Sequence, residues 1–168
     1  MAIPLCSIAV GELCRHGHEG KQMVKKLHEL PRQELERIFN AAPFVASLGI
    51  TLVSIGPGEC ETELAIEPHH LQQDGYVHAG VQATMADHTA GGAAATLTGP
   101  GEFVLTAEFK INFLRAAKGE NLRCKSKVLK PGSQLTVVES EVYCEQEEAS
   151  KRVSKATVSI AVVSKKRS

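Results

Sequence analysis

Residues 74–97, DGYVHAGVQATMADHTAGGAAATL, carry the main signal for the fold. Their alanine-rich run predicts one long helix over roughly 78–96, and the TGPG at 98–101 closes that helix. Glycine costs about 1 kcal/mol of helix stability relative to alanine, so the Gly91-Gly92 pair indicates that another element packs closely against the helix. The helix carries a single acid, Asp87, which follows His78 by nine residues.

Strand patterns flank this helix on both sides. Residues 48–56 and 60–67 read as two strands around the turn GPGE, and a helix that begins at Pro31 and ends at Pro43 precedes them. Four more strands follow the long helix at 103–114, 121–130, 134–144 and 153–163. Because only short turns separate these last strands, they must pair antiparallel. The sequence predicts an α+β fold in which a curved antiparallel sheet covers one long helix.

Alternation of side chains predicts which face of each strand is buried. In residues 60–67, Cys60, Thr62, Leu64 and Ile66 share the buried face and glutamates fill the other. In residues 103–114, Phe103, Leu105, Ala107, Phe109, Ile111 and Phe113 share one face, and Val104, Thr106, Glu108, Lys110 and Asn112 share the other.

Composition limits the class of protein. The chain has 168 residues, with 19 Lys plus Arg against 19 Asp plus Glu, so nothing favours nucleic acid or an anionic membrane as a partner. There is no apolar run of membrane-spanning length and no signal-peptide pattern, and the five cysteines form no C-x-x-C pair. We therefore expect a cytoplasmic protein with free thiols. We divide it into an N-terminal extension (1–30), one globular domain (31–163) and a basic tail (164–168).

The segment HLQQDGYVHAGVQATMADHTAG resembles the acyl-CoA thioesterases of the PaaI-like (phenylacetic-acid-degradation) family, which have the hotdog fold. The family pattern, roughly H-x-N-x-x-G-x-x-H-G-G followed by an acid nine residues after the second His, is matched by His70, Gln72, Gly75, His78, Ala79, Gly80 and Asp87. LTAEFKINFLRAAKGENL resembles a later strand of the family. Two positions depart from the pattern. Gln72 stands where Asn is common, although a related branch that acts on aromatic acyl thioesters also has Gln there, and Ala79 replaces the first Gly of Gly-Gly.

The resemblance implies hydrolysis of an acyl-CoA thioester without a cofactor. Asp87 is expected to act as general base or as nucleophile, and Thr106 to orient the water. The amide of Ala79, within the Ala79–Gly80 helix start, is the expected oxyanion donor, with Gln72 directed to the carbonyl or to the water. His78 is expected to orient this loop or Gln72 rather than to act as the base, or it is simply the residue that begins the helix.

The spacing also predicts how the site is assembled. Nine helical residues span roughly 13 Å at about 1.5 Å each, so Asp87 cannot reach a carbonyl held at the start of its own helix. The acid must come from another chain, and the resemblance implies a homodimer, with a tetramer also open, in which Asp87 of one chain faces the partner's His78.

Two other functions stay open at this stage. The departures at Gln72 and Ala79 suit a protein that binds acyl-CoA without hydrolysing it. A hotdog hydratase or dehydratase is a third reading, although the spacing from His78 to Asp87 fits a thioesterase better. A metal site is not expected, because no histidine pair has the H-x-x-x-H spacing on a helix. Lys110, Arg115, Lys118 and Lys130 are candidates for contacts with the phosphates of CoA.

Overall fold

The computed structural model describes residues 32–99, 101–147 and 149–164. The elements run in the order α2 (Arg32–Phe39), α3 (Pro43–Ser47), β1 (Thr51–Gly56), β2 (Glu59–Ala65), the 3-10 turn η2 (Pro68–His70), α4 (Ala79–Ala95), β3 (Glu102–Phe113), β4 (Asn121–Lys130), β5 (Leu135–Gln146) and β6 (Ala149–Ser164). In the sequence, Met23, Val24 and Leu27 share one face and predict a short helix within 20–29, which lies outside the described residues. The division into extension, domain and tail remains a prediction.

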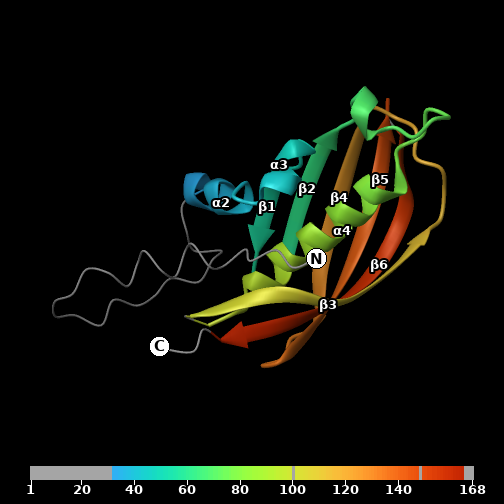
Figure 1. Ribbon diagram of the computed structural model, residues 1–168. Coiled ribbons are helices and arrows are strands. Elements are labelled where there is room, and N and C mark those ends of the chain that lie inside the picture. The colour runs from blue at the N-terminus through green and yellow to red at the C-terminus, as the bar shows by residue number, and fades with distance from the viewer. Residues whose placement is uncertain (1–31, 100, 148, 165–168) are drawn as a thin grey trace.

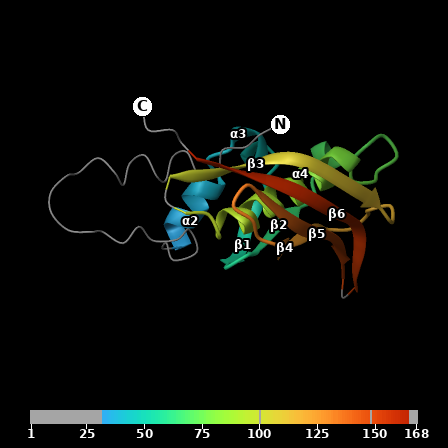
Figure 2. The same ribbon diagram turned by 90° about the horizontal axis from the view of Figure 1, so that it is seen from below.

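The six strands form one antiparallel sheet in the order β1-β2-β4-β5-β6-β3. The sheet curves around α4, which runs along its concave face, while α2 and α3 lie beside β1 (Figure 1). Seen from below, β3 and β6 close over one side of α4 (Figure 2). The predicted α+β arrangement is confirmed.

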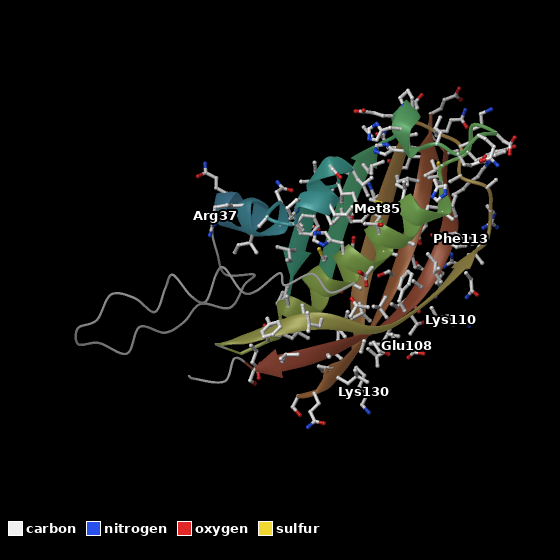
Figure 3. All side chains as sticks on the ribbon, viewed as in Figure 1. Arg37, Met85, Glu108, Lys110, Phe113 and Lys130 are labelled. Carbon is white, nitrogen blue, oxygen red and sulfur yellow. The ribbon has the colours of Figure 1, made fainter. Side chains whose placement is uncertain are left out.

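Burial of small side chains explains why α4 sits so deep in the sheet. Twelve of its 17 residues are buried, and Met85 is fully enclosed (Figure 3). A Cβ atom at Gly92 would lie 3.0 Å from Cys60 Sγ on β2, which is tighter than ordinary van der Waals contact. The close packing predicted from Gly91-Gly92 is thus present at Gly92.

Polar groups fasten α4 to the sheet at two places. The buried Ser140 hydroxyl of β5 donates to the Ala86 carbonyl at 2.9 Å. At the C-terminal end of α4, Thr96 Oγ1 accepts a hydrogen bond from the Gly58 amide at 2.7 Å and donates one to the Ala93 carbonyl. Asp87, which directly follows Ala86, therefore stands on a helix held to the strands along its length.

The structure corrects one assignment of faces. The pairing with β6 shifts between Thr106 and Glu108, which leaves Ala107 as an extra residue in β3. Before this bulge Val104 is buried and Thr106 faces α4, whereas after it Phe109 packs on the core. The simple alternation predicted for 103–114 was wrong because the bulge reverses its phase.

Elsewhere the structure extends the expectations. Pro43 follows the end of α2, as predicted, but it also begins the second short helix α3, so β1 begins at Thr51 rather than at residue 48. On β2 the predicted buried face is confirmed for Cys60, Thr62 and Leu64. The cysteines Cys60, Cys124 and Cys144 are buried free thiols, as expected.

Candidate active site

Asp87 lies in the middle of α4 and faces β3. The Thr106 hydroxyl donates a hydrogen bond of 2.7 Å to Asp87 Oδ1. Burial raises the pKa of the Asp87 carboxyl above its usual value, and the bond from Thr106 opposes that rise. No described residue donates a hydrogen bond to Oδ2. Oδ1 of the carboxyl is therefore fixed by a hydrogen bond, and Oδ2 remains available to a ligand.

The start of α4 leaves one amide free for a ligand. His78 is the N-cap residue, and its Nδ1 accepts the Gly80 N–H at 2.9 Å, while its carbonyl accepts the Val81 N–H at 3.0 Å. Within the described part of the chain, the exposed Ala79 amide has no acceptor. A free amide at the positive end of a 17-residue helix is suited to bind an oxyanion.

His78 and Gly80 shape this helix start. Because His78 Nδ1 accepts a hydrogen bond, the ring carries its hydrogen on Nε2. A Cβ atom at residue 80 would lie 2.9 Å from His78 Nδ1, so glycine allows the ring to fold over the first turn. Gly80 thus supports the His78 cap, and its amide is already occupied.

Gln72 lies in the tight loop that precedes α4. Leu71 and Val77 form an isolated antiparallel bridge, and inside it the Gln72 amide donates to the Tyr76 carbonyl at 2.8 Å. Gly75 turns the loop with φ +79°. The side-chain oxygen of Gln72 accepts the Asp74 N–H at 2.6 Å. The Nε2 amide of Gln72 is therefore the end that remains available as a donor.

The predicted site residues fall into two groups. Gln72, His78, Ala79 and Gly80 lie together in the loop and first turn of α4, whereas Asp87 and Thr106 lie together between α4 and β3. Among the described residues, no hydrogen bond or ion pair joins the two groups. One chain thus separates its candidate acid from its candidate donors, as the helical spacing requires.

Two cavities lie near candidate contacts for CoA. One, of about 380 Å³, is lined by Arg115, Lys118 and Lys151, and the neighbouring Ala117 carbonyl accepts the Val77 N–H. The other, of about 370 Å³, is lined by the Pro131–Ser133 turn at the far end of α4, next to Lys130 (Figure 3). Lys110 is exposed on β3.

The described residues hold no group of three or more His, Cys, Asp or Glu side chains placed to bind a metal. None of the helices among them is long and apolar enough to cross a membrane.

A residue that the site prediction left out is His70. It is 2% exposed and accepts the His78 N–H through its carbonyl at 2.8 Å. Its position two residues before Gln72, as the first His of the motif, was the available signal.

A long helix enclosed by an antiparallel sheet, with an acid at mid-helix and free donors at the helix start, defines a hotdog-fold enzyme. Residues 74–151 match the model of the thioesterase superfamily. The chain is 32% identical to human acyl-coenzyme A thioesterase 13 over 106 residues, which cover 62% of this chain and 75% of the relative. The chain belongs to the thioesterase superfamily and is a thioester hydrolase.

Solved structures agree. A thioesterase family protein from Silicibacter pomeroyi is 32% identical, with a TM-score of 0.76 over 79% of this chain and 97% of that one. The PaaI protein of the E. coli phenylacetic acid degradation operon, at 20% identity, shares the fold with a TM-score of 0.69 over 78% of this chain and 91% of that one. The predicted membership of the hotdog thioesterases is confirmed.

Proposed function

We propose that the protein hydrolyses an acyl-CoA thioester to the free acid and CoA in a homodimer whose two active sites each use both chains. The observation that carries this proposal is the division of the site: Asp87 with Thr106 in one place, and the free donors of Ala79 and Gln72 in another. Each half lacks what the other offers, so two chains arranged antiparallel about a two-fold axis complete two sites.

An open sheet edge supports the dimer. Among the described strands β3 pairs with β6 alone, which leaves a 12-residue edge strand that is available to pair with a second chain. Thr106 stands on this edge strand beside Asp87. If a two-fold axis brings Asp87 of one chain next to the partner's His78, that axis passes α4 midway between residues 78 and 87, beside Ala83. Ala83 is half-buried and small, which suits close approach of two chains.

The proposed chemistry needs an activated attacker and a stabilised oxyanion. With Asp87 as general base, its carboxylate takes a proton from water while the water oxygen attacks the thioester carbon. The resulting oxyanion is bound by the Ala79 amide and Gln72 Nε2. The C–S bond then breaks, and the CoA thiolate takes up the proton from Asp87.

With Asp87 as nucleophile, one carboxylate oxygen attacks the same carbon and displaces CoA as the thiolate. The mixed anhydride formed is then hydrolysed by water, which regenerates Asp87. In both routes Thr106 holds one carboxyl oxygen and leaves the other directed to the reaction. Single-turnover hydrolysis in H₂¹⁸O distinguishes the routes, because only the anhydride route can place label in Asp87.

The cavity lined by Arg115, Lys118 and Lys151, with Glu147 as its one acid, supports a place for the phosphates of CoA, with Arg115 and Lys118 as their candidate partners. The second cavity, at the KPGS turn, is an alternative place for the same group, with Lys130 nearby. The free thiols of the described cysteines support the proposal of a reducing, cytoplasmic location.

The direct test is release of CoA from a panel of aliphatic and aromatic acyl-CoA esters by the wild type and by Asp87→Ala. We expect turnover by the wild type and loss of at least about a hundredfold in the variant. Equal rates in the two proteins would remove Asp87 from the mechanism. Binding without turnover would support a non-hydrolytic acyl-CoA protein, and hydration of crotonyl-CoA would support a hydratase. A blank with protein alone is needed, because the chain has five cysteines of its own that can add to the signal of a thiol reagent.

A further inference from the structure

His70 is a buried side chain that joins three segments of the chain. Its Nδ1 accepts the Glu67 N–H at 3.0 Å, at the entry to η2. Its Nε2 lies 3.0 Å from the carbonyl of Leu48, which precedes β1 and is 22 positions away in the chain. A carbonyl only accepts hydrogen bonds, so Nε2 carries the proton and donates it.

The backbone of His70 makes the third connection. Its carbonyl accepts the His78 N–H, so a backbone hydrogen bond links the residue that caps α4 directly to His70. Gln72 lies two residues after His70, and Ala79 lies one residue after His78. Between them the loop closes through the Leu71–Val77 bridge. Both candidate donors thus stand on a loop whose base is His70.

We propose that His70 is a positioning residue of the thioesterase site: its ring fixes the loop so that Gln72 Nε2 and the Ala79 amide point to one carbonyl oxygen. The inference rests on the proposed function. Both donors act only if they lie within hydrogen-bond distance of the same developing charge, and small displacements of such groups reduce rates strongly. A ring that bonds at both nitrogens sets position and rotation of the loop base at once.

The ring works in its neutral form. Protonation of Nδ1 would remove the acceptor of the Glu67 N–H, and burial together with the nearby His69 lowers the pKa of His70. The titratable groups that face the ring are His69, with ring centroids 3.9 Å apart, and Glu67. Neither competes for the two ring nitrogens, because His69 pairs with the Glu67 carboxylate at 3.4 Å.

The test compares His70→Ala, which loses both ring bonds, with His70→Asn and His70→Gln. The Asn side-chain oxygen can accept the Glu67 N–H, and the Gln side-chain nitrogen can donate to Leu48. We expect His70→Ala to lower kcat for acyl-CoA at least about tenfold with KM changed less than about threefold, and each amide variant to recover part of kcat. His69→Ala is the matched control, since it removes the adjacent, exposed imidazole and leaves both bonds of His70 intact.

All rates are measured at a temperature where circular dichroism shows each variant fully folded, so that a purely structural role of His70 would leave kcat unchanged. A folded His70→Ala with the wild-type kcat overturns the inference. If His70→Ala does not fold, the amide variants decide: each lacks one bond, and wild-type kcat in both overturns the inference equally. If the wild type hydrolyses none of the esters, the proposed function is wrong. That result is distinct from a failure of the inference about His70.

Discussion

Asp87 bears a carboxylate in a place that favours the uncharged acid. Burial raises the pKa of its carboxyl, and the hydrogen bond from Thr106 only partly offsets that effect. A carboxyl whose pKa is higher in the folded than in the unfolded chain contributes stability below the unfolded pKa. That contribution is lost as the pH rises through the folded pKa. At neutral pH the folded protein therefore bears the cost of an ionised Asp87.

Asp87→Asn separates this cost from catalysis. The Asn side-chain oxygen can still accept the Thr106 hydroxyl, while the buried charge is gone. We expect hydrolysis to fall at least about a hundredfold and Tm at pH 7 to rise above that of the wild type. The difference in Tm should shrink as the pH falls below the usual pKa of Asp, where the wild-type carboxyl is protonated too. Thermal unfolding followed across this pH range checks the sign, and a lower Tm at pH 7 would contradict it.

Some residue roles could be predicted from spacing and others could not. The positions of Asp87, Gln72 and Ala79 follow from a motif, because distance along a helix or loop is set by the number of residues. The occupied amide of Gly80 could not be predicted, since it depends on the rotamer by which His78 folds its Nδ1 over the helix start. The role of His70 likewise needs the contact with Leu48, which is distant in the chain.

At the scale of elements, α4 packs closely against β2 at Gly92. Alanine favours a helix by about 1 kcal/mol over glycine, so Gly92→Ala would stabilise an isolated helix. In the protein the added Cβ atom meets Cys60 Sγ at 3.0 Å within a filled core. We expect Gly92→Ala to lower the free energy of unfolding by about 1–3 kcal/mol because the core is overpacked.

A double-mutant cycle identifies the cause of that loss. Cys60→Ala removes the sulfur, so the double variant should be more stable than the sum of the two single changes predicts. Urea unfolding of the four proteins measures the coupling. Additive losses would show that Gly92 is required for a reason other than the distance to Cys60.

Elements were easier to predict than their details. The six strands follow from the alternation of side chains along each strand, and the long helix follows from its run of small residues. Both patterns are local in the sequence. The bulge at Ala107 does not follow from such a pattern, because every residue from 103 to 113 continues the alternation in sequence while pairing with β6 shifts its phase. This bulge allows Val104 and Thr106 to face α4 before it and Phe109 to face the core after it.

At the scale of the whole molecule, charge pairing indicates which surfaces remain for another chain. Across the outer face of the sheet, Glu61, Lys125, Glu141 and Lys155 stand opposite one another on β2, β4, β5 and β6. The end pairs form ion pairs of 3.7 and 3.3 Å. Such ion pairs near the surface add little stability, but they give each charge an opposite partner and make this face of the sheet hydrophilic. In the proposed homodimer, the edge of β3 and the exposed start of α4 are the surfaces that meet the partner.

The shared active site can be tested by mixing two inactive homodimers. Asp87→Asn removes the acid from one chain and Gln72→Ala removes a donor from the other, and we expect each pure homodimer to be strongly impaired. A heterodimer places both defects in one site and leaves the second site intact. Co-expression with two affinity tags yields the heterodimer, which should have about half the activity of the wild-type dimer, whereas a random mixture should have about a quarter.

This result depends on geometry that a site within one chain cannot reproduce. If Asp87 acted with Gln72 of its own chain, each site of the heterodimer would contain one defect, and the purified heterodimer would be no more active than the average of its parents. The matched control is a heterodimer of Asp87→Asn with Thr106→Val. Thr106 bonds Asp87 within the same chain, so the shared arrangement puts these two defects in different sites and predicts no restored activity. Rescue by Gln72→Ala but not by Thr106→Val would assign Asp87 and Thr106 to one half of the site and Gln72 to the other.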